Sequence, residues 1–363
     1  MTTRVERWSE TPSSQRDAFR RAFVECAGPL RGDRAAAHAP SPRYTELILR
    51  LALSRSCDLL LAKDGAVTGR ALVTAVTGRS AAAIGLIELG AGNAGLDAVR
   101  AIVDAAAEWA EQAGLDELIA PVDVNTWFAY RFLLPPVPGV PAPPPFAWEP
   151  AQPAEYPQLF ESLGFAELER YQTMGGDLDE AVGESAAAVL AATETAFRNA
   201  AQAGFTFHRL ETAGALAPLL DELHPLCMEA FRDNMLFEPI PLELFRSLYG
   251  ESAGGRDASL THWVRDGSGR LAGFVLAFVD GDVAAVKTIA VTPALRGKRI
   301  SSALVHLVLE TAVERGLRKV VSALVRRGNT SEHLSSPYLA LGVTPWKREY
   351  VLMRRAAIAG SGR

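Results

Sequence analysis

The stretch from Thr288 to Gly316 constrains the fold most, because its spacing changes from that of a strand to that of a helix within a few residues. Ile289 and Val291 are β-branched and stand two apart, as one face of a strand requires. Thr292-Pro293 ends the strand, since proline has no N–H to donate to a sheet. The next residues to fall at helical spacing are Leu304, Leu307, Val308, Thr311 and Ala312. The pattern predicts a strand, a tight turn and a helix that ends at Gly316.

The turn of this unit is strongly basic. Arg296-Gly297-Lys298-Arg299 places three cations and a flexible glycine just before the predicted helix. The N-terminus of a helix offers unpaired N–H groups and a partial positive charge, so it favours phosphate. The turn therefore indicates a site for a ligand with a pyrophosphate. A solvated basic corner on an ordinary strand–helix turn is the alternative that these residues leave open.

The same residues resemble a known motif. Val291-x-Pro293-x-x-Arg296-Gly297-x-Arg299-x-Ser301 is similar to motif A of the GNAT superfamily of acyltransferases, V-x-P-x-x-R-G-x-G-x-G/A. In that family the loop holds the pyrophosphate of coenzyme A. This chain departs from the motif at two glycines, which are Arg299 and Ser301 here. Ser301 is small enough to let the backbone approach a phosphate, whereas Arg299 is bulkier.

The resemblance implies a donor site for acetyl-CoA or another acyl-CoA, without a metal. In the family the strand that corresponds to Lys287–Val291 splays from the one that corresponds to Lys319–Val325. The pantetheine arm then pairs with the first strand as an added strand would. Asn329 resembles the asparagine of the family's motif B. The implied donor-binding residues are Ile289, Ala290, Val291, Arg296, Gly297, Lys298, Arg299, Ile300, Ser301, Ser302 and Asn329.

The resemblance also implies a general acid. Tyr338, in the segment PYLALGV, matches the tyrosine of the family's Y-x-x-x-G-F pattern. In the family this hydroxyl lies near the donor sulfur, and a thiolate leaves more readily when a proton donor is within reach. A core aromatic with a hydrated hydroxyl is the alternative for Tyr338.

A base must remove the proton of the attacking amine. Glu238, Asp233 and Glu229 lie in the segment that covers the acceptor side in the family, and His224 and His262 are alternatives with a suitable ordinary pKa. A surface charge or a satisfied polar group remains open for each of them. We predict Tyr338, Glu238 and Asp233 as the catalytic residues.

The two halves of the chain share their order of elements and some of their sequence. AEWAEQAGLDELIAPVDVNT in the first half corresponds to LETAVERGLRKVVSALVRRGNT in the second, and LFESLGFAELERYQTM to PYLALGVTPWKREYVLM. We predict an α/β (α+β) fold of two tandem GNAT-like domains, each a mixed, mostly antiparallel twisted sheet flanked by helices. The predicted parts are a degenerate domain (1–176), a connecting helix (177–204), an acyltransferase domain (205–356) and a disordered tail (357–363).

The first copy lacks the basic loop. Glu88-Leu89-Gly90-Ala91-Gly92-Asn93 offers glycines but no cation, and Asp97 adds a negative charge to the predicted helix start. A pyrophosphate would find no counter-charge there, so we predict a scaffold or part of a substrate wall. Asn125, Trp127 and Tyr130 line a cleft in one interpretation and pack against the proline-rich segment 135–157 in the other.

Composition limits the classes of function. A chain of 363 residues with 48% hydrophobic and 22% charged residues is ordinary for a globular protein and long enough for two domains. A net charge of −5 argues against nucleic acid as a partner. Three scattered cysteines fit no metal or disulfide pattern, which favours a reducing cytoplasm. We find neither a secretory signal nor an apolar run of about 18–20 residues, so we expect no membrane partner.

The sequence thus predicts an N-acyltransferase that moves an acetyl or other acyl group from coenzyme A to the amine of a small molecule in a ternary complex. One alternative is acyl transfer from the phosphopantetheine arm of an acyl carrier protein. Another is a catalytically silent, GNAT-like ligand-binding protein. We expect the protein to be a monomer or a homodimer.

Overall fold

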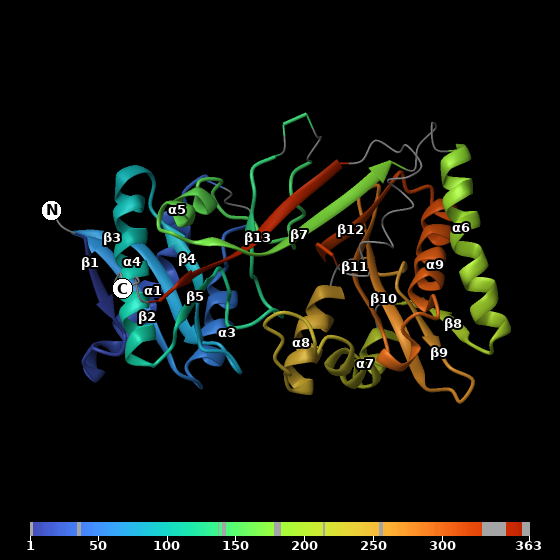
Figure 1. Ribbon diagram of the computed structural model, residues 1–363, viewed down its shortest axis with the longest axis horizontal. Helices are drawn as coiled ribbons and strands as arrows, with labels where there is room; N and C mark the ends of the chain where they lie inside the picture. The colour runs from blue at the N-terminus through green and yellow to red at the C-terminus, as the bar shows by residue number, and fades with distance from the viewer. Residues whose placement is uncertain are drawn as a thin grey trace, which may run out of the picture. The chain divides into compact units, whose positions relative to one another are not determined.

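The computed structural model describes residues 3–34, 38–136, 138–139, 143–177, 183–212, 215–253, 257–328 and 346–357. It divides into two compact units, coloured by residue number in Figure 1. Unit 1 comprises Met1–Pro135, Pro144–Arg170 and Glu349–Arg363, and unit 2 comprises Pro136–Pro143 and Tyr171–Arg348. Each unit is thus built from stretches that are distant in the chain.

Unit 1 holds one twisted sheet with strand order β1-β2-β3-β4-β5-β13, and β6 also pairs with β13. Neighbouring strands are antiparallel except β4 and β5. The elements that begin in this unit are β1 (Arg4–Arg7), α1 (Arg16–Glu25), α2 (Ala27–Arg31), α3 (Pro42–Ala52), β2 (Cys57–Asp64), β3 (Ala66–Ala75), β4 (Ala81–Leu89), α4 (Gly92–Gln112), β5 (Glu117–Ala120), β6 (Phe132–Leu133), α5 (Tyr156–Ser162) and β7 (Ala166–Asp177).

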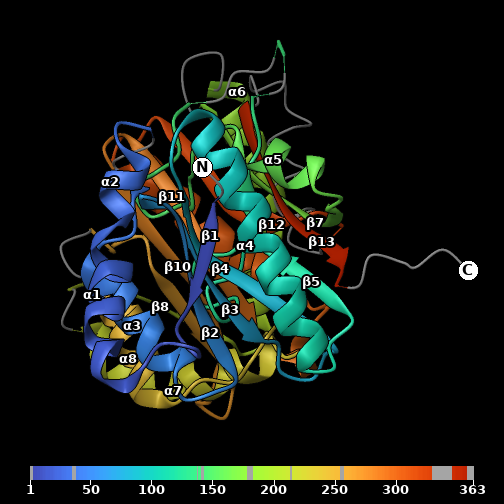
Figure 2. The same cartoon turned by 90° about the vertical axis from the view of Figure 1, so that its left-hand side faces the viewer.

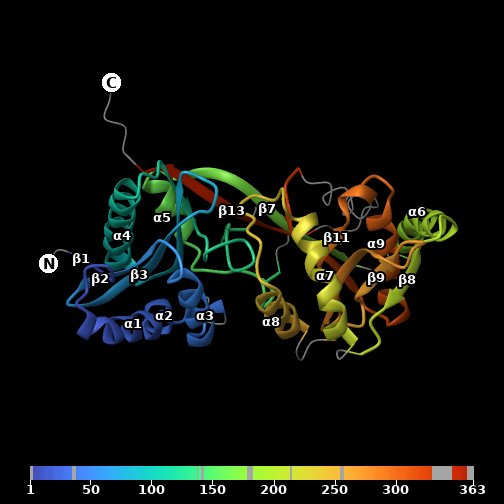
Figure 3. The ribbon, with the colours of Figure 1, turned by 90° about the horizontal axis from the view of Figure 1, so that it is seen from below.

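Helices cover both faces of this sheet. Figures 2 and 3 show α4 on one face and α1, α2 and α3 on the other. The apolar face of α4, which carries Val99, Ile102 and Val103, packs on β2, β3 and β4 to form the core. Helix α4 begins at Gly92, so Asp97, which the sequence places at the helix start, lies beyond its first turn.

Unit 2 has the sheet order β7-β12-β11-β10-β9-β8, in which only β11 and β12 are parallel. One face carries α9, which is covered in turn by α6, and the other carries α7 and α8 (Figure 3). The elements are α6 (Gly183–Gln202), β8 (Thr206–Arg209), α7 (Leu216–Ala230), α8 (Leu242–Ala253), β9 (His262–Arg265), β10 (Leu271–Asp280), β11 (Val283–Val291), α9 (Ile300–Glu314), β12 (Lys319–Arg326) and β13 (Trp346–Ala356).

The boundaries of the units differ from the predicted ones, because two strands pass from one unit to the other. The predicted boundary near residue 176 falls inside β7, whose last residues pair with β12 in unit 2. Strand β13 ends in unit 1, where Met353–Ala356 pair with β5. Ala357, predicted to begin a disordered tail, is buried and donates its N–H to Asp116, whereas 358–363 lie outside the described residues.

The predicted connecting helix belongs to the packing of unit 2. Thr193 of α6 contacts His306 of α9 through a 3.1 Å hydrogen bond, and the Phe197 ring stacks on the same imidazole. The fold class is the predicted one: two α/β units, each with a mixed, mostly antiparallel sheet between helices. Within the described ranges, no helix combines the length and the apolar character that a membrane crossing needs.

Candidate functional site

The site begins where β11 and β12 part. The two parallel strands pair from Val283 with Lys319 to Val286 with Ser322, and their pairing in the described residues ends there. Both strands nevertheless continue, β11 to Val291 and β12 to Arg326. The register of β10 and β11 shifts between Leu276 and Ala277, so β11 contains an extra residue at this point. We call the stretch of both strands beyond this last pair the opening; the resemblance to the GNAT family implies that the strands part here.

The donor-binding residues predicted on β11 lie along this opening. Ile289 and Val291 are half-buried and pack against the core on the α9 side of the sheet. Ala290 is buried and faces the other side, as alternation along a strand requires. Beyond Val286, β11 still pairs with β10 along one edge, and its other edge lies on the side of β12, where an extended ligand could add as a strand.

The basic loop connects this strand to α9. Gly297 has a φ of 82°, and Arg299, at the N-cap of α9, has a φ of 58°. An arginine adopts this left-handed conformation at a cost that glycine would not have, and the position is one at which the family motif has glycine. The departure at Arg299 thus places a cation in a left-handed backbone conformation that glycine adopts most readily.

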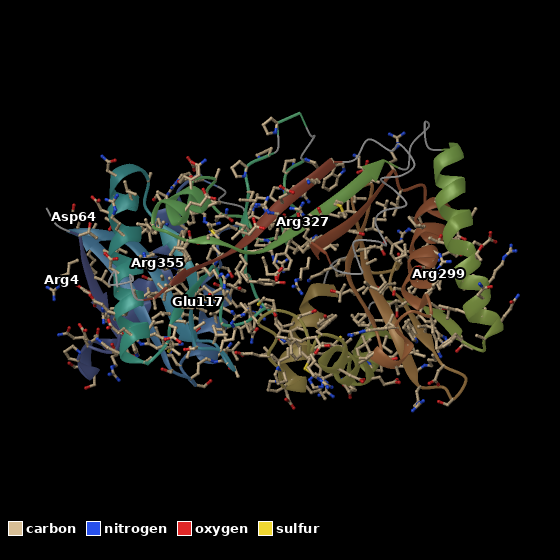
Figure 4. The ribbon with its side chains drawn as sticks, viewed as in Figure 1. Arg4, Asp64, Glu117, Arg299, Arg327 and Arg355 are labelled. Atoms are coloured by element: carbon tan, nitrogen blue, oxygen red, sulfur yellow. The ribbon has the colours of Figure 1, made fainter. Side chains whose placement is uncertain are left out.

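The start of α9 retains the features of an anion site. Its N-cap makes no side-chain hydrogen bond, and the first N–H groups of a helix, here from Ile300 to Ser302, have no partner within the helix. Ile300 is buried, and Ser301 and Ser302 are half-buried. Arg296, Lys298 and Arg299 are all exposed around this end, where Figure 4 labels Arg299. Their charges add to the partial positive charge of the helix.

Arg296 also contacts the end of α7. Its guanidinium donates a 2.9 Å hydrogen bond to the carbonyl of Ala230 and lies 3.8 Å from the carboxylate of Asp233. Both charged side chains are more than half exposed, so the ion pair itself contributes little to stability. The predicted base Asp233 therefore lies beside the basic loop, and its role as a base stays a prediction.

The other predicted bases lie in different surroundings. Glu238, between α7 and α8, is only 6% exposed, and Glu229 is exposed near the end of α7. His224 shares a 2.7 Å hydrogen bond with the carbonyl of Ile240. Glu238 is thus the only one of these three that combines a carboxylate with burial, and its role stays a prediction.

His262 does not fit the role of a base at this opening. It is buried, its Nε2 lies 3.3 Å from the hydroxyl of Thr311, and burial lowers its pKa to about 4. Thr311 is eleven residues along α9 from Ile300, which places it about 16 Å from the helix start at 1.5 Å per residue. His262 therefore serves the core at the far end of α9. Tyr338 and Asn329 lie outside the described residues, so the roles predicted for them are untested.

Sequence reasoning missed a buried hydroxyl group beside the opening. The hydroxyl of Tyr249, on α8, is hydrogen-bonded to the side chains of Thr288 on β11 and Cys227 on α7. The ring of Tyr249 stacks on Phe245 at 4.3 Å between centroids. The one sequence signal was Thr288, a hydroxyl residue in a strand that is otherwise apolar except for Lys287, but nothing local identified its partner.

The corresponding opening of unit 1 is occupied by the chain itself. Strands β4 and β5 pair only from Ala81 to Ala83, after which Val122 donates its N–H to the carbonyl of Ile84. The Asp123 carboxylate then accepts a 2.6 Å hydrogen bond from the N–H of Leu86. The approach is so close that a Cβ on Gly85 would overlap the carbonyl of Val122.

Other parts of unit 1 also bind the backbone at the end of β4. The hydroxyl of Tyr156 accepts a 2.7 Å hydrogen bond from the N–H of Leu89, and Arg34 donates one of 2.7 Å to the Leu89 carbonyl. Side chains thus satisfy the backbone groups that correspond in register to Val291, since Leu89 pairs with Gly69 as Val291 pairs with Gly273. No backbone group described at Leu89 is left for an added strand.

A buried ion pair completes the closure of unit 1. Glu88 accepts hydrogen bonds of 2.7 and 2.9 Å from Arg31, and the two side chains are 1% and 5% exposed. Burial raises the pKa of Glu88, and Arg31 opposes this effect. The first turn of α4 contains no acidic residue, because Asp97 lies beyond it. Gly95, in this first turn, lies so close to the carbonyl of Gly90 that a Cβ on Gly95 would overlap it.

The residues predicted to line a cleft in unit 1 make local contacts. Asn125 is buried, and its side-chain oxygen accepts a hydrogen bond from the N–H of Trp127. The Arg131 guanidinium lies over the ring of Tyr130, 3.7 Å from its centroid. These contacts favour a packing role for the three residues.

Comparisons with known proteins agree with this geometry. Residues 190–332 match the family model of the acetyltransferase (GNAT) domain. No curated protein matches the chain. Unit 2 therefore contains a GNAT domain, and the chain resembles the GNAT acyltransferases.

Solved structures show the same fold for the whole chain. A tandem GNAT protein from the clavulanic acid biosynthesis pathway matches with a TM-score of 0.53 at 14% identity, over 99% of this chain and 100% of that one. A conserved protein of Enterococcus faecalis V583, described as a probable N-acyltransferase, matches with a TM-score of 0.57 at 9% identity, over 98% and 73%. The fold is thus that of two GNAT-like domains in tandem.

Proposed function

We propose that unit 2 transfers an acetyl or other acyl group from coenzyme A to an amine of a small molecule. The observation that carries this proposal is the parting of β11 and β12 directly before a basic loop and an uncapped helix start. The opening suits a narrow, amide-bearing arm, and the loop suits the pyrophosphate at the end of that arm. Both features lie in the segment that matches the GNAT family model.

The donor would bind along β11. The pantetheine amides would pair with the backbone of residues 289–291, as an added strand does. The pyrophosphate would lie at the N-terminus of α9, where the N–H groups of Ile300–Ser302 and the cations Arg296, Lys298 and Arg299 surround it. Arg296 would exchange its contacts with Ala230 and Asp233 for contacts with phosphate.

The chemistry would need little covalent help from the protein. A neutral amine attacks the thioester carbonyl, and backbone N–H groups of β11 stabilise the oxyanion that develops. The bond between carbon and nitrogen forms as the bond between carbon and sulfur breaks. Tyr338 would give a proton to the thiolate, and Glu238 or Asp233 would take one from the amine, directly or through water.

The setting of this activity is part of the proposal. The partner is a small amine, with no role for nucleic acid or a membrane, and the protein acts as a monomer or homodimer in the cytoplasm. The three cysteines are free thiols, which suits a reducing compartment. Unit 1 would be a scaffold, because its own side chains occupy the place of a donor.

Titration calorimetry with acetyl-CoA, longer acyl-CoAs and pantetheine tests this function. We expect one donor site per chain for the intact protein. A variant with Arg296→Ala and Lys298→Ala should bind acetyl-CoA at least about tenfold more weakly, because it loses two charged contacts to phosphate. Arg198→Ala, which removes an exposed arginine of α6, is the matched control and should bind normally.

Three outcomes would contradict the proposal in different ways. Binding of pantetheine and of an acylated carrier protein, without binding of acyl-CoA, would replace the coenzyme by a carrier-protein donor. Two donor sites per chain would contradict the assignment of unit 1 as a scaffold. Absence of binding by any of these ligands would leave a silent ligand-binding protein as the better account.

A further inference from the structure

Strand β12 contains a bulge directly beside the opening. Its pairing with β7 is regular up to Ser322, the residue that also forms the last pair with β11, and the register then shifts before Val325. Two residues of β12, Ala323 and Leu324, therefore stand opposite the single residue Thr173 of β7. Such a bulge bends the strand that carries it and increases its local twist. Strand β12 thus changes direction at the point where its pairing with β11 ends.

Leu324 has an unusual backbone conformation within this bulge. Its φ is 56°, in the left-handed region that glycine adopts freely and that leucine adopts only against the steric repulsion of its Cβ. A residue persists in such a conformation only where its surroundings fix it, and residues of this kind cluster at functional sites. A contact around Leu324 must therefore offset the repulsion.

The side chain of Thr173 supplies such a contact. Its Oγ1 accepts a 3.1 Å hydrogen bond from the N–H of Leu324. Thr173 is 0% exposed, so water does not compete for this bond. Strand β7 is itself held nearby, because the Trp346 ring lies so close to Gly175 that a Cβ on Gly175 would overlap it. The N–H of Leu324 is therefore bound on the side of β7, away from β11.

Unit 1 has a different arrangement at its corresponding opening. Leu86 of β4 is also left-handed, with a φ of 47°, and its N–H donates a 2.6 Å hydrogen bond to the carboxylate of Asp123. Asp123 belongs to the segment that follows β5, the parallel partner of β4. In unit 1 the acceptor thus comes from across the opening, whereas in unit 2 Thr173 comes from the strand behind β12.

We propose that Thr173 is a positioning residue for the acyl transfer of unit 2. Its side-chain oxygen holds Leu324 in the left-handed conformation, and the resulting bulge keeps β12 apart from β11 so that the donor arm can enter. Without this bond, Leu324 can return to the extended conformation that leucine prefers, and its N–H can then pair with β11 across the opening. The inference rests on the proposed function and adds the group that keeps its donor site open.

A set of variants tests this inference by titration calorimetry with acetyl-CoA. Thr173→Val keeps the shape of the side chain and removes the accepting oxygen, whereas Thr173→Ser keeps the oxygen. Leu324→Gly removes the steric repulsion, and it is combined with Thr173→Val to show whether glycine makes the hydroxyl dispensable. Thr261→Val is the control, because Thr261 is also a buried threonine of unit 2 whose hydroxyl binds a strand backbone, at Ala277.

We expect Thr173→Val to bind acetyl-CoA about three- to tenfold more weakly, because the loss of one hydrogen bond lowers the population of the open arrangement by up to that factor. At saturating acetyl-CoA its kcat should change little. Thr173→Ser and Thr261→Val should bind nearly as the parent does. The double variant with Leu324→Gly should recover most of the loss, because glycine adopts the left-handed conformation without the help of Thr173.

Hydrogen–deuterium exchange without any ligand gives a second readout, which does not depend on donor binding. In Thr173→Val, the amides of residues 289–291 should exchange more slowly than in the parent, because β11 gains a partner strand on its second edge. Thr173→Ser should exchange as the parent does. Unchanged exchange at 289–291 in Thr173→Val would contradict the closing of the opening.

The inference is overturned if Thr173→Val binds acetyl-CoA as the parent does, or if the double variant binds no better than Thr173→Val alone. Equal weakening in Thr261→Val would show a general effect of buried threonine hydroxyls in this unit and would overturn it too. A parent protein that binds no acyl-CoA contradicts the proposed function, and this inference with it. A parent and a Thr173→Val variant that bind equally well contradict this inference alone.

Discussion

At the scale of single residues, Arg31 and Glu88 show how side chains fill the space beside β4 in unit 1. A carboxylate of 1% exposure survives in the core of unit 1 because one guanidinium gives it two hydrogen bonds. The pair stands where unit 2 has Ala290, since Glu88 faces Arg70 in the sheet as Ala290 faces Phe274. Two charges thus fill space that a small residue leaves in the other copy.

Replacing only one member of this ion pair should lower the free energy of unfolding much more than replacing both members. In Arg31→Met the buried Glu88 loses both hydrogen bonds, and we expect the free energy of unfolding to fall by about 3–5 kcal/mol. Arg31→Met combined with Glu88→Leu should recover most of that loss, because no charge is then left unpaired. Urea denaturation followed by fluorescence measures all three proteins. Additive losses in the double variant would contradict the assignment.

At the scale of elements, Asp123 joins three parts of unit 1. Its carboxylate accepts from the N–H of Leu86 in β4 and from the hydroxyl of Tyr44 in α3, which lies 2.9 Å away. The same hydroxyl accepts from the N–H of Ala129, so it also fixes the segment after β5. Burial is the largest effect on the pKa of Asp123 and raises it to about 6.

The stability of unit 1 should therefore depend on pH. A carboxyl whose pKa is raised by folding binds its proton more tightly in the folded chain, so stability is present below pH 4 and is lost as pH rises through 6. The loss between pH 4 and 7 is up to about 3 kcal/mol, at about 1.36 kcal/mol per pKa unit. Asp123→Asn should remove this fall in stability between pH 4 and 7. His262 opposes it, because burial lowers its pKa to about 4 and unit 2 gains stability as pH rises toward 6.5.

A test of this pH effect compares chemical denaturation of the parent, Asp123→Asn and His262→Gln between pH 4 and 7. Asp123→Asn should show a steeper rise of stability with pH than the parent, because only the effect of His262 remains. His262→Gln should show a steeper fall, because only the effect of Asp123 remains. Identical slopes in all three proteins would contradict the assigned pKa directions.

Sequence reasoning identified the elements whose signals are local. The change from strand to helix at residues 288–316 depends on near neighbours, and so do the cations of the loop between them. The exchange of β7 and β13 between units was missed, because Lys319 pairs with Asp177 and Ala356 with Glu117 across more than 140 residues. The contact of Tyr249 with Thr288 was missed for the same reason. Long-range pairing leaves no spacing that a sequence can show.

At the scale of the whole molecule, the two units share a fold and differ in what fills one opening. In unit 1, Asp123, Tyr156 and Arg34 satisfy the backbone of β4. In unit 2, β11 runs past its last partner on β12 toward a basic helix start. Under the proposed function, one unit has a place for a donor, and in the other the chain's own side chains take that place.

Hydrogen–deuterium exchange with and without acetyl-CoA tests this central claim most directly. The account predicts that acetyl-CoA slows exchange of the amides at 289–291 and 297–302 and leaves those at 86–95 unchanged, because the donor binds to β11 and the start of α9. Slower exchange at 86–95, with no change at 289–302, would show the donor in unit 1 and contradict the account.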